Sequence, residues 1–152
     1  MFVGTWRYEG EQVDPPVAGL PYGGAGEFHG TDTRRLVLDG RFMESMIEDN
    51  NPSGKTTVVS LTGYDPKAGH YVVNGFISDG SRDTATETVS ADGRTWTTRS
   101  TMTTSSGQTV PVRTVTTFSP DGSRMTSTTE VSPDGGTTWK HWYKDESQRV
   151  KD

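Results

Sequence analysis

Short stretches of alternating apolar and polar residues run through the chain, and turn-forming residues separate them. These stretches are rich in Thr, Val and aromatic residues. In no stretch do the apolar residues recur with the period of a helix. Asp-Gly, Asn-Pro, Asp-Pro and Ser-Gly pairs predict turns that begin near residues 39, 51, 65, 79, 92, 106, 121 and 134. This regular spacing indicates an antiparallel meander of about ten strands.

A meander of this length has two unpaired edges unless it closes on itself. We therefore expect an all-β fold, an up-and-down antiparallel barrel of about ten strands, in which residues 1–152 form a single domain. The stretch 12–26 is rich in Pro and Gly and is predicted to be a long loop. It either lies across one mouth of the barrel or serves as a solvent-exposed connector.

Strand alternation separates an inner from an outer face in the second half of the chain. From residue 96 onward one parity carries large apolar groups with Thr and Ser, and the other carries most of the charges. Small hydroxyl residues cannot fill a ten-stranded lumen, so a cavity is expected. The predicted lumenal, ligand-binding residues are Trp96, Met102, Phe118, Met125, Trp139, His141 and Tyr143. In the stretch 41–48 either parity could face inward.

Composition narrows the classes of function. The chain has 152 residues, of which 29% are hydrophobic, and no Cys, so disulfides and thiol chemistry are excluded. The net charge of -5 argues against a nucleic-acid partner. No apolar window is long enough for a membrane span. The chain is expected to be soluble, and either a cytoplasmic location or export with removal of a leader fits.

Several polar residues are candidates for chemistry. His141 shares the predicted inner parity with Trp139 and Tyr143, and Glu44 lies within a predicted strand, so these two are the candidate catalytic residues. Asn74 and Glu87 also lie within strands. The three His residues have no metal-ligand spacing, and neither a metal nor a cofactor is expected.

The segment 132–139, SPDGGTTW, matches the S-x-D-x-G-x-T-W pattern of an Asp-box. Ser132 and Asp134 can accept backbone hydrogen bonds, and the two glycines that follow permit a tight reversal. We expect a hairpin device with no catalytic part.

Taken together, several motifs resemble the DUF1579 family of lipocalin-like proteins of unknown function. They are Gly4-Thr5-Trp6, the segment 38–44 (LDGRFME), Gly63-Tyr64-Asp65 followed by Tyr71-Val72-Val73, and the Asp-Gly-Gly hairpin before an aromatic last strand. The resemblance implies a calycin-type barrel and no established reaction. Gly-Thr-Trp is also similar to the opening of fatty-acid-binding proteins and nitrobindins.

Three functions fit these expectations. The first is binding of a small apolar or amphipathic molecule in the lumen. The second is a lumenal enzyme of the cyclase, isomerase or hydratase kind, for which His141 and Glu44 would have to converge in the cavity. The third is haem binding through His141, as the similarity to nitrobindins suggests. The oligomeric state stays open, a homodimer included.

Overall fold

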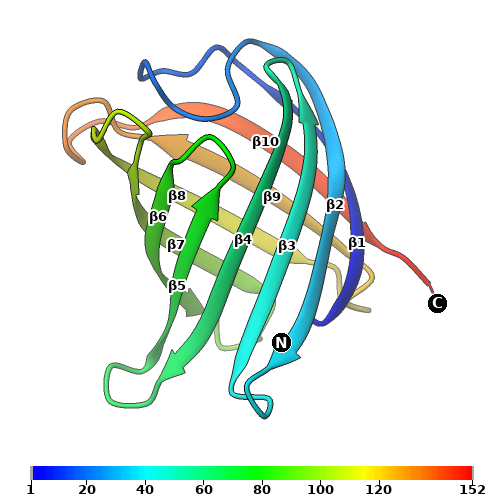
Figure 1. Ribbon diagram of the computed structural model, residues 1–152. Coiled ribbons are helices and arrows are strands. Elements are labelled where there is room, and N and C mark those ends of the chain that lie inside the picture. The colour runs from blue at the N-terminus through cyan, green and yellow to red at the C-terminus, as the bar shows by residue number, and fades with distance from the viewer. Residues whose placement is uncertain (1, 152) are drawn as a thin grey trace.

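The computed structural model describes residues 2–151 and arranges them as a closed antiparallel barrel. Its strands are β1 (Gly4–Gln12), β2 (Gly26–Val37), β3 (Phe42–Asn51), β4 (Gly54–Asp65), β5 (His70–Ile77), β6 (Arg82–Val89), β7 (Thr95–Thr103), β8 (Thr109–Phe118), β9 (Arg124–Val131) and β10 (Lys140–Arg149). Each strand pairs with the next, and β1 pairs with β10, so the sheet has no free edge (Figure 1). The predicted fold class is confirmed. Within residues 2–151, no helix has the length and apolar character that crossing a bilayer requires.

The loop 13–25 lies across one mouth of the barrel, at the upper end in Figure 1, so the first of the two expectations for this stretch is right. Leu20 is buried, and Val17 and Tyr22 pack against the same apolar cluster. The Gln12 side-chain amide fixes the loop because it donates to the backbone oxygens of Tyr22 (2.7 Å) and Gly24 (2.6 Å). We call loop 13–25 the cap and the opposite end, where β1 begins and β10 ends, the open mouth.

Apolar side chains gather at the two ends of the barrel and leave its middle more polar. Beneath the cap lies a buried cluster of Leu20, Val58, Ile77, Met102, Val110, Val112, Val131 and Trp142. Near the open mouth, Trp6, Phe118 and Met125 pack with Phe2 and Trp96. Phe2 stacks on Phe118 with ring centroids 3.7 Å apart, so Phe2, which precedes β1, forms part of this end.

The alternation predicted for the second half of the chain is confirmed for β7, β8 and β9. Met102, Val110, Val112, Phe118, Met125 and Val131 are all buried. In β3, where the sequence left two possibilities, Ser45 is buried and Met43 and Ile47 line the interior. Phe42 and Met46 are exposed on the outer wall, because the register of β3 against β2 and β4 sets this parity.

The segment 132–139 is a self-contained turn. Ser132 Oγ donates to Asp134 Oδ1 (2.8 Å), Gly136 N–H donates to Ser132 Oγ (2.6 Å), and Thr138 N–H donates to Asp134 Oδ1 (2.7 Å). Two other turns repeat the Ser-to-Asp bond, at Ser90–Asp92 and Ser119–Asp121. The Asp-box therefore serves as a hairpin device, and its Ser-to-Asp bond occurs in three turns of the described residues 2–151.

We expect Asp134 to support the fold at neutral pH and to lose that role in acid. Its hydrogen bonds to Thr138 lower the pKa of its carboxyl to about 2. A lowered folded-state pKa means that the stabilisation is present above the ordinary pKa and is lost as pH falls towards 2. Urea midpoints measured from pH 2 to 7 should therefore fall more steeply in acid for the wild type than for Asp134→Asn. Parallel curves for the two proteins would contradict this role.

Candidate lumenal binding site

The interior between the two apolar ends holds two adjoining chambers. The inner chamber, below the cap, has a volume of about 190 Å³, and its wall includes Tyr8, Tyr22, Phe28, Tyr143 and Asp145. The outer chamber, towards the open mouth, has a volume of about 210 Å³, and its wall includes Phe2, Tyr71, Glu87, Trp96 and Phe118. Asp32, Arg34 and Ile47 line both, so the chambers meet at these three side chains.

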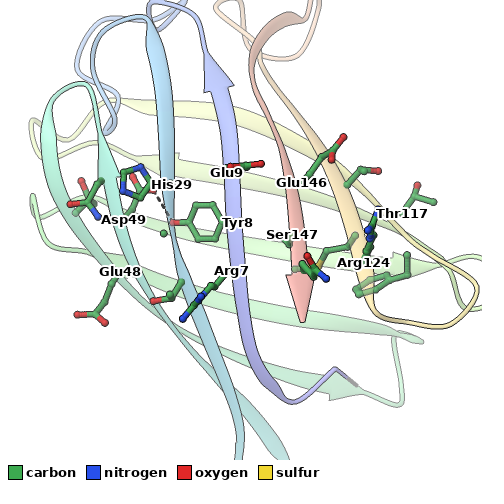
Figure 2. A pocket seen from close by; sticks show the side chains of 18 of the residues that line it. Arg7, Tyr8, Glu9, His29, Glu48, Asp49, Thr117, Arg124, Glu146 and Ser147 are labelled. Carbon is green, nitrogen blue, oxygen red and sulfur yellow. Dashed lines mark hydrogen bonds between the residues drawn. The ribbon is translucent and has the colours of Figure 1, made fainter. Parts of the chain in front are cut away.

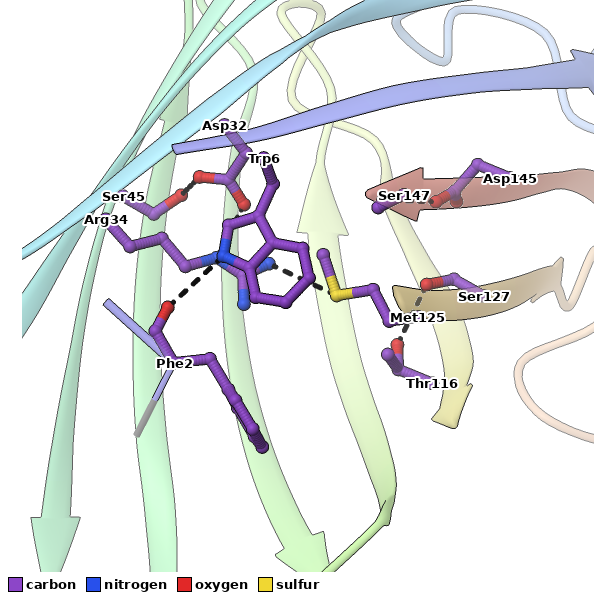
Figure 3. Close-up of polar contacts among 10 residues, drawn as sticks. All are labelled: Phe2, Trp6, Asp32, Arg34, Ser45, Thr116, Met125, Ser127, Asp145 and Ser147. Carbon is purple, nitrogen blue, oxygen red and sulfur yellow. Dashed lines mark hydrogen bonds and ion pairs between the residues drawn. The ribbon is translucent and has the colours of Figure 1, made fainter. Parts of the chain in front are cut away.

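An ion pair of β2 stands where the chambers meet. Strand alternation places the pair inside the barrel, because the inward residues of β2 are Phe28, Gly30, Asp32 and Arg34. Arg34 Nε lies 2.7 Å from Asp32 Oδ2, and Ser45 Oγ donates to the other carboxylate oxygen at 2.5 Å. The guanidinium lies 5.8 Å from the Trp6 ring centroid, and its Nη2 lies 4.0 Å from Met125 Sδ (Figure 3). Asp32 and the Trp6 ring together compensate the Arg34 charge.

Four aromatic rings surround the inner chamber. The Tyr143 ring lies nearly perpendicular to that of Tyr22, with centroids 6.4 Å apart, and to that of Phe28, at 5.7 Å. Tyr8 and Phe28 follow at 6.1 Å. β1, the cap, β2 and β10 each contribute one ring, and the rings form adjoining walls.

Glycines in β1 and β2 make room for two of these rings. Tyr8 pairs across the strands with Gly30, and Gly10 pairs with Phe28. A Cβ atom on Gly30 would collide with the Tyr8 ring, and one on Gly10 would collide with the Phe28 ring and the Lys144 backbone oxygen. Each ring therefore lies flat over the neighbouring strand, where a side chain would otherwise stand.

Besides Asp32 of β2, carboxylates of β3, β6 and β10 face the interior. Asp49 accepts a hydrogen bond from the Tyr8 hydroxyl (2.8 Å), and Glu87 accepts one from Thr98 (2.9 Å). Burial raises the pKa of Asp83, of Glu87 and, most clearly, of Asp145, whose pKa reaches about 7. Within residues 2–151, no three His, Asp or Glu side chains are grouped so that they could hold a metal ion.

The outer wall beside β1 differs from the chambers. Figure 2 shows this region from close by. Arg7, Glu9 and Glu146 belong to the polar outer surface, whereas the hydroxyl of Tyr8, which lies between Arg7 and Glu9 on β1, donates a hydrogen bond to Asp49. The pocket at this wall is lined mainly by charged residues and Thr. In the two chambers, by contrast, apolar and polar side chains surround the same cavity. We therefore take the chambers as the candidate site.

The sequence of this barrel matches a known protein family over almost its whole length. The family model DUF1579, described as a protein of unknown function, matches residues 1–149. The chain belongs to the DUF1579 family. A comparison with curated proteins found no match.

Solved structures similar to this DUF1579 member are barrels of remote sequence. The crystal structure of Rv2717c from M. tuberculosis superposes with a TM-score of 0.69 at 11% identity, over 98% of this chain and 92% of that one. A de novo designed fluorescence-activating β-barrel has a TM-score of 0.46 at 16% identity, over 98% of this chain and 94% of the design. At such identities the likeness to Rv2717c shows the fold alone.

Five of the seven predicted lumenal residues face the interior of the DUF1579 barrel. Trp96 and Phe118 line the outer chamber, and Met125 and Tyr143 line the inner one. Met102 also points inward, but it is buried in the cluster beneath the cap and lines neither chamber.

The predicted inward orientation of Trp139 and His141 is wrong, and a β-bulge is the reason. His141 pairs with Glu130 and Tyr143 pairs with Thr129, so Trp142 is an extra residue in β10. His141 is consequently exposed. Trp139 lies outside, with the Arg113 guanidinium 4.4 Å from its ring centroid.

Trp142, the extra residue of the bulge, points into the interior, where strict alternation would have placed His141. Trp142 is fully buried beneath the cap, 5.7 Å from the Tyr22 ring. Its Nε1–H has no hydrogen-bond partner in the described part of the chain.

Glu44 likewise belongs to the outer wall, where it forms an ion pair with Arg35 at 2.7 Å. His141 and Glu44 therefore do not converge in the lumen, and the candidate catalytic pair loses its geometric basis. Of the other strand residues considered, Asn74 is exposed and Glu87 lines the outer chamber.

The sequence analysis did not place the polar residues at the centre of the site in the lumen, and from residue 96 onward it assigned most charges to the outer face. They are Asp32, Arg34, Asp49 and Asp145. A signal was present for Asp145, which alternates with Tyr143 and Ser147. Another was present for Asp32, which follows Phe28 and Gly30 on the same face.

Asp145 should cost stability at neutral pH. Its folded-state pKa of about 7 exceeds the usual 3.8, so the contribution of Asp145 to stability is fully present below the usual pKa and is lost as pH rises through 7. Asp145→Asn removes the buried charge and should stabilise the protein at pH 8, by up to about 4 kcal/mol. Urea denaturation followed by Trp fluorescence should show the two stability curves converging below pH 4. A constant offset across the range would refute the assignment.

Gly10→Ala should destabilise the barrel, because its methyl group would collide with Phe28 and the Lys144 backbone. Overpacking of this kind costs about 1–3 kcal/mol. The outward neighbour Glu9→Ala is the matched control and should leave the denaturation midpoint nearly unchanged. Equal midpoints for both variants would show that Phe28 does not need the space.

Proposed function

We propose that the protein binds a small, largely apolar molecule in the two chambers. A barrel is compatible with ligand binding, and the observation that supports the proposal is the pair of cavities inside this one. Two chambers of about 190 and 210 Å³ adjoin in the middle of a closed sheet. Aromatic and aliphatic side chains share their walls with hydroxyl groups and with a few charged side chains, so apolar surface and fixed polar groups meet there, as they do in ligand sites.

The open mouth supplies the route into the chambers. The outer chamber is lined by residues at the open-mouth ends of their strands, including Met43, Tyr71 and Trp96, whereas the cap closes the other end. A ligand entering by the open mouth would pass Phe2 and Trp96 before reaching Arg34 and the inner chamber. Its apolar surface would be removed from water along the whole path.

Binding is favoured over the two alternatives that the sequence suggested. The enzymatic alternative required His141 and Glu44 in the lumen, and haem binding required a lumenal His141. Both side chains lie on the outer wall.

A cavity-filling variant tests the proposal. The neutral dye N-phenyl-1-naphthylamine should gain fluorescence with the wild type and reach saturation. Ser127→Phe places a ring in the inner chamber and should weaken dye binding about tenfold or more, since the ring occupies the space that the dye needs. Its matched control is Thr128→Phe, on the exposed outer face of the same strand, which should bind like the wild type.

Fluorescence gain that is equally weak for all three proteins, or equally strong, would overturn lumenal binding. Circular dichroism of each variant should retain the β-sheet spectrum of the wild type, which ties any loss of dye binding to the occupied chamber.

A further inference from the structure

The interior carries an excess of negative charge. Arg34 is the cation at the chamber wall, and Asp32 already pairs with it. The other inward carboxylates are those of Asp49, Asp83, Glu87 and Asp145. Their hydrogen bonds are to hydroxyl or amide groups, such as Tyr8 for Asp49 and Ser147 for Asp145, and none of the four forms a salt bridge within residues 2–151.

Aromatic walls and two of these carboxylates meet in the inner chamber. Tyr8, Tyr22, Phe28 and Tyr143 line it together with Asp49 and Asp145. Rings that stand nearly perpendicular to one another, as Tyr143 does to Tyr22 and Phe28, form the kind of box in which proteins hold ammonium groups by cation–π attraction. Burial strengthens that attraction because water no longer screens it.

A second, independent feature points to an occupant. Tyr22 is half-buried between the cap and the barrel, and among the described residues its hydrogen bonds involve only its backbone oxygen. Its side chain lines the inner chamber. A ligand with a polar group at this place would give the Tyr22 hydroxyl a hydrogen-bond partner.

We propose that the inner chamber binds the protonated amine of an amphipathic ligand, whose apolar part lies in the outer chamber. This inference rests on the lumenal binding proposed above and names the ligand class. The ammonium is held by Asp145 and Asp49 within the four rings, and the apolar part packs on Trp96, Tyr71 and Phe118. Anionic ligands are disfavoured because the Arg34 charge is already matched by Asp32.

Three compounds of similar shape separate the possibilities. Phenethylamine is a cation at pH 7.5, phenethyl alcohol is neutral, and hydrocinnamate is an anion. Each is used to displace N-phenyl-1-naphthylamine from the wild-type protein. We expect the amine to compete at least about tenfold more tightly than the alcohol, which is the effect of a desolvated cation–π and ion-pair contact, and hydrocinnamate to compete most weakly.

Two variants locate the ammonium. Asp145→Asn keeps the shape of the side chain and removes its charge, so the affinity for phenethylamine should fall about tenfold while that for the alcohol changes little. Glu146→Gln, the outward neighbour on β10, is the matched control and should keep the wild-type preference. Tyr143→Leu should reduce the preference for amine over alcohol as well, because it removes one wall of the box.

Each outcome decides between the proposals. Equal competition by amine and alcohol, a preference for hydrocinnamate, or no displacement by any of the three overturns the ammonium site and leaves lumenal binding intact. Failure of the dye itself to bind the wild type overturns lumenal binding. An amine preference that Asp145→Asn and Glu146→Gln reduce equally would also overturn the site, since surface charge would then explain it.

Discussion

The pairing of β1 with β10 is the constraint on which the rest of the molecule depends. Seven residue pairs, from Trp6 with Arg149 to Gln12 with Tyr143, join the two ends of the meander. Closure pairs the backbone hydrogen-bonding groups at both edges of the sheet, and it encloses the side chains that point inward. The inner face of each strand must therefore supply either packing or a polar group with a partner.

The interior meets that requirement in different ways along its length. Beneath the cap, aliphatic residues and Trp142 make a solid cluster, while the middle holds hydroxyl groups and the Asp32–Arg34 pair. Thr114 and Thr129, for example, hydrogen-bond to each other at 2.8 Å. A chain with only 29% hydrophobic residues can thus fold stably, because hydrogen-bonded barrel walls replace much of the apolar core.

Prediction from the sequence succeeded where a strand obeys strict alternation and its turns are distinct. β7, β8 and β9 are such strands, and their inward residues were identified correctly. It failed in β10, because a bulge has no reliable sequence signal and one extra residue reverses the parity of everything before it. It also failed for Arg34 and the inward carboxylates, because a lone charge in a strand is assigned to solvent unless its cross-strand partner is known. The Ser45 hydroxyl and the Trp6 ring that hold the Asp32–Arg34 pair come from β3 and β1, and only the register brings them there.

The bulge at Trp142 also affects how this barrel can diversify. His141 and Tyr143 pair with consecutive residues of β9, so the register on both sides is the one an uninterrupted strand would have. Deleting Trp142 would leave the same side chains facing the chambers and would remove only the ring beneath Tyr22. One inserted residue has thus added a support for the cap without disturbing the rest of the wall. Substitutions that change the packing of the cap can therefore occur without changing the side chains that line the chambers, and the reverse also holds.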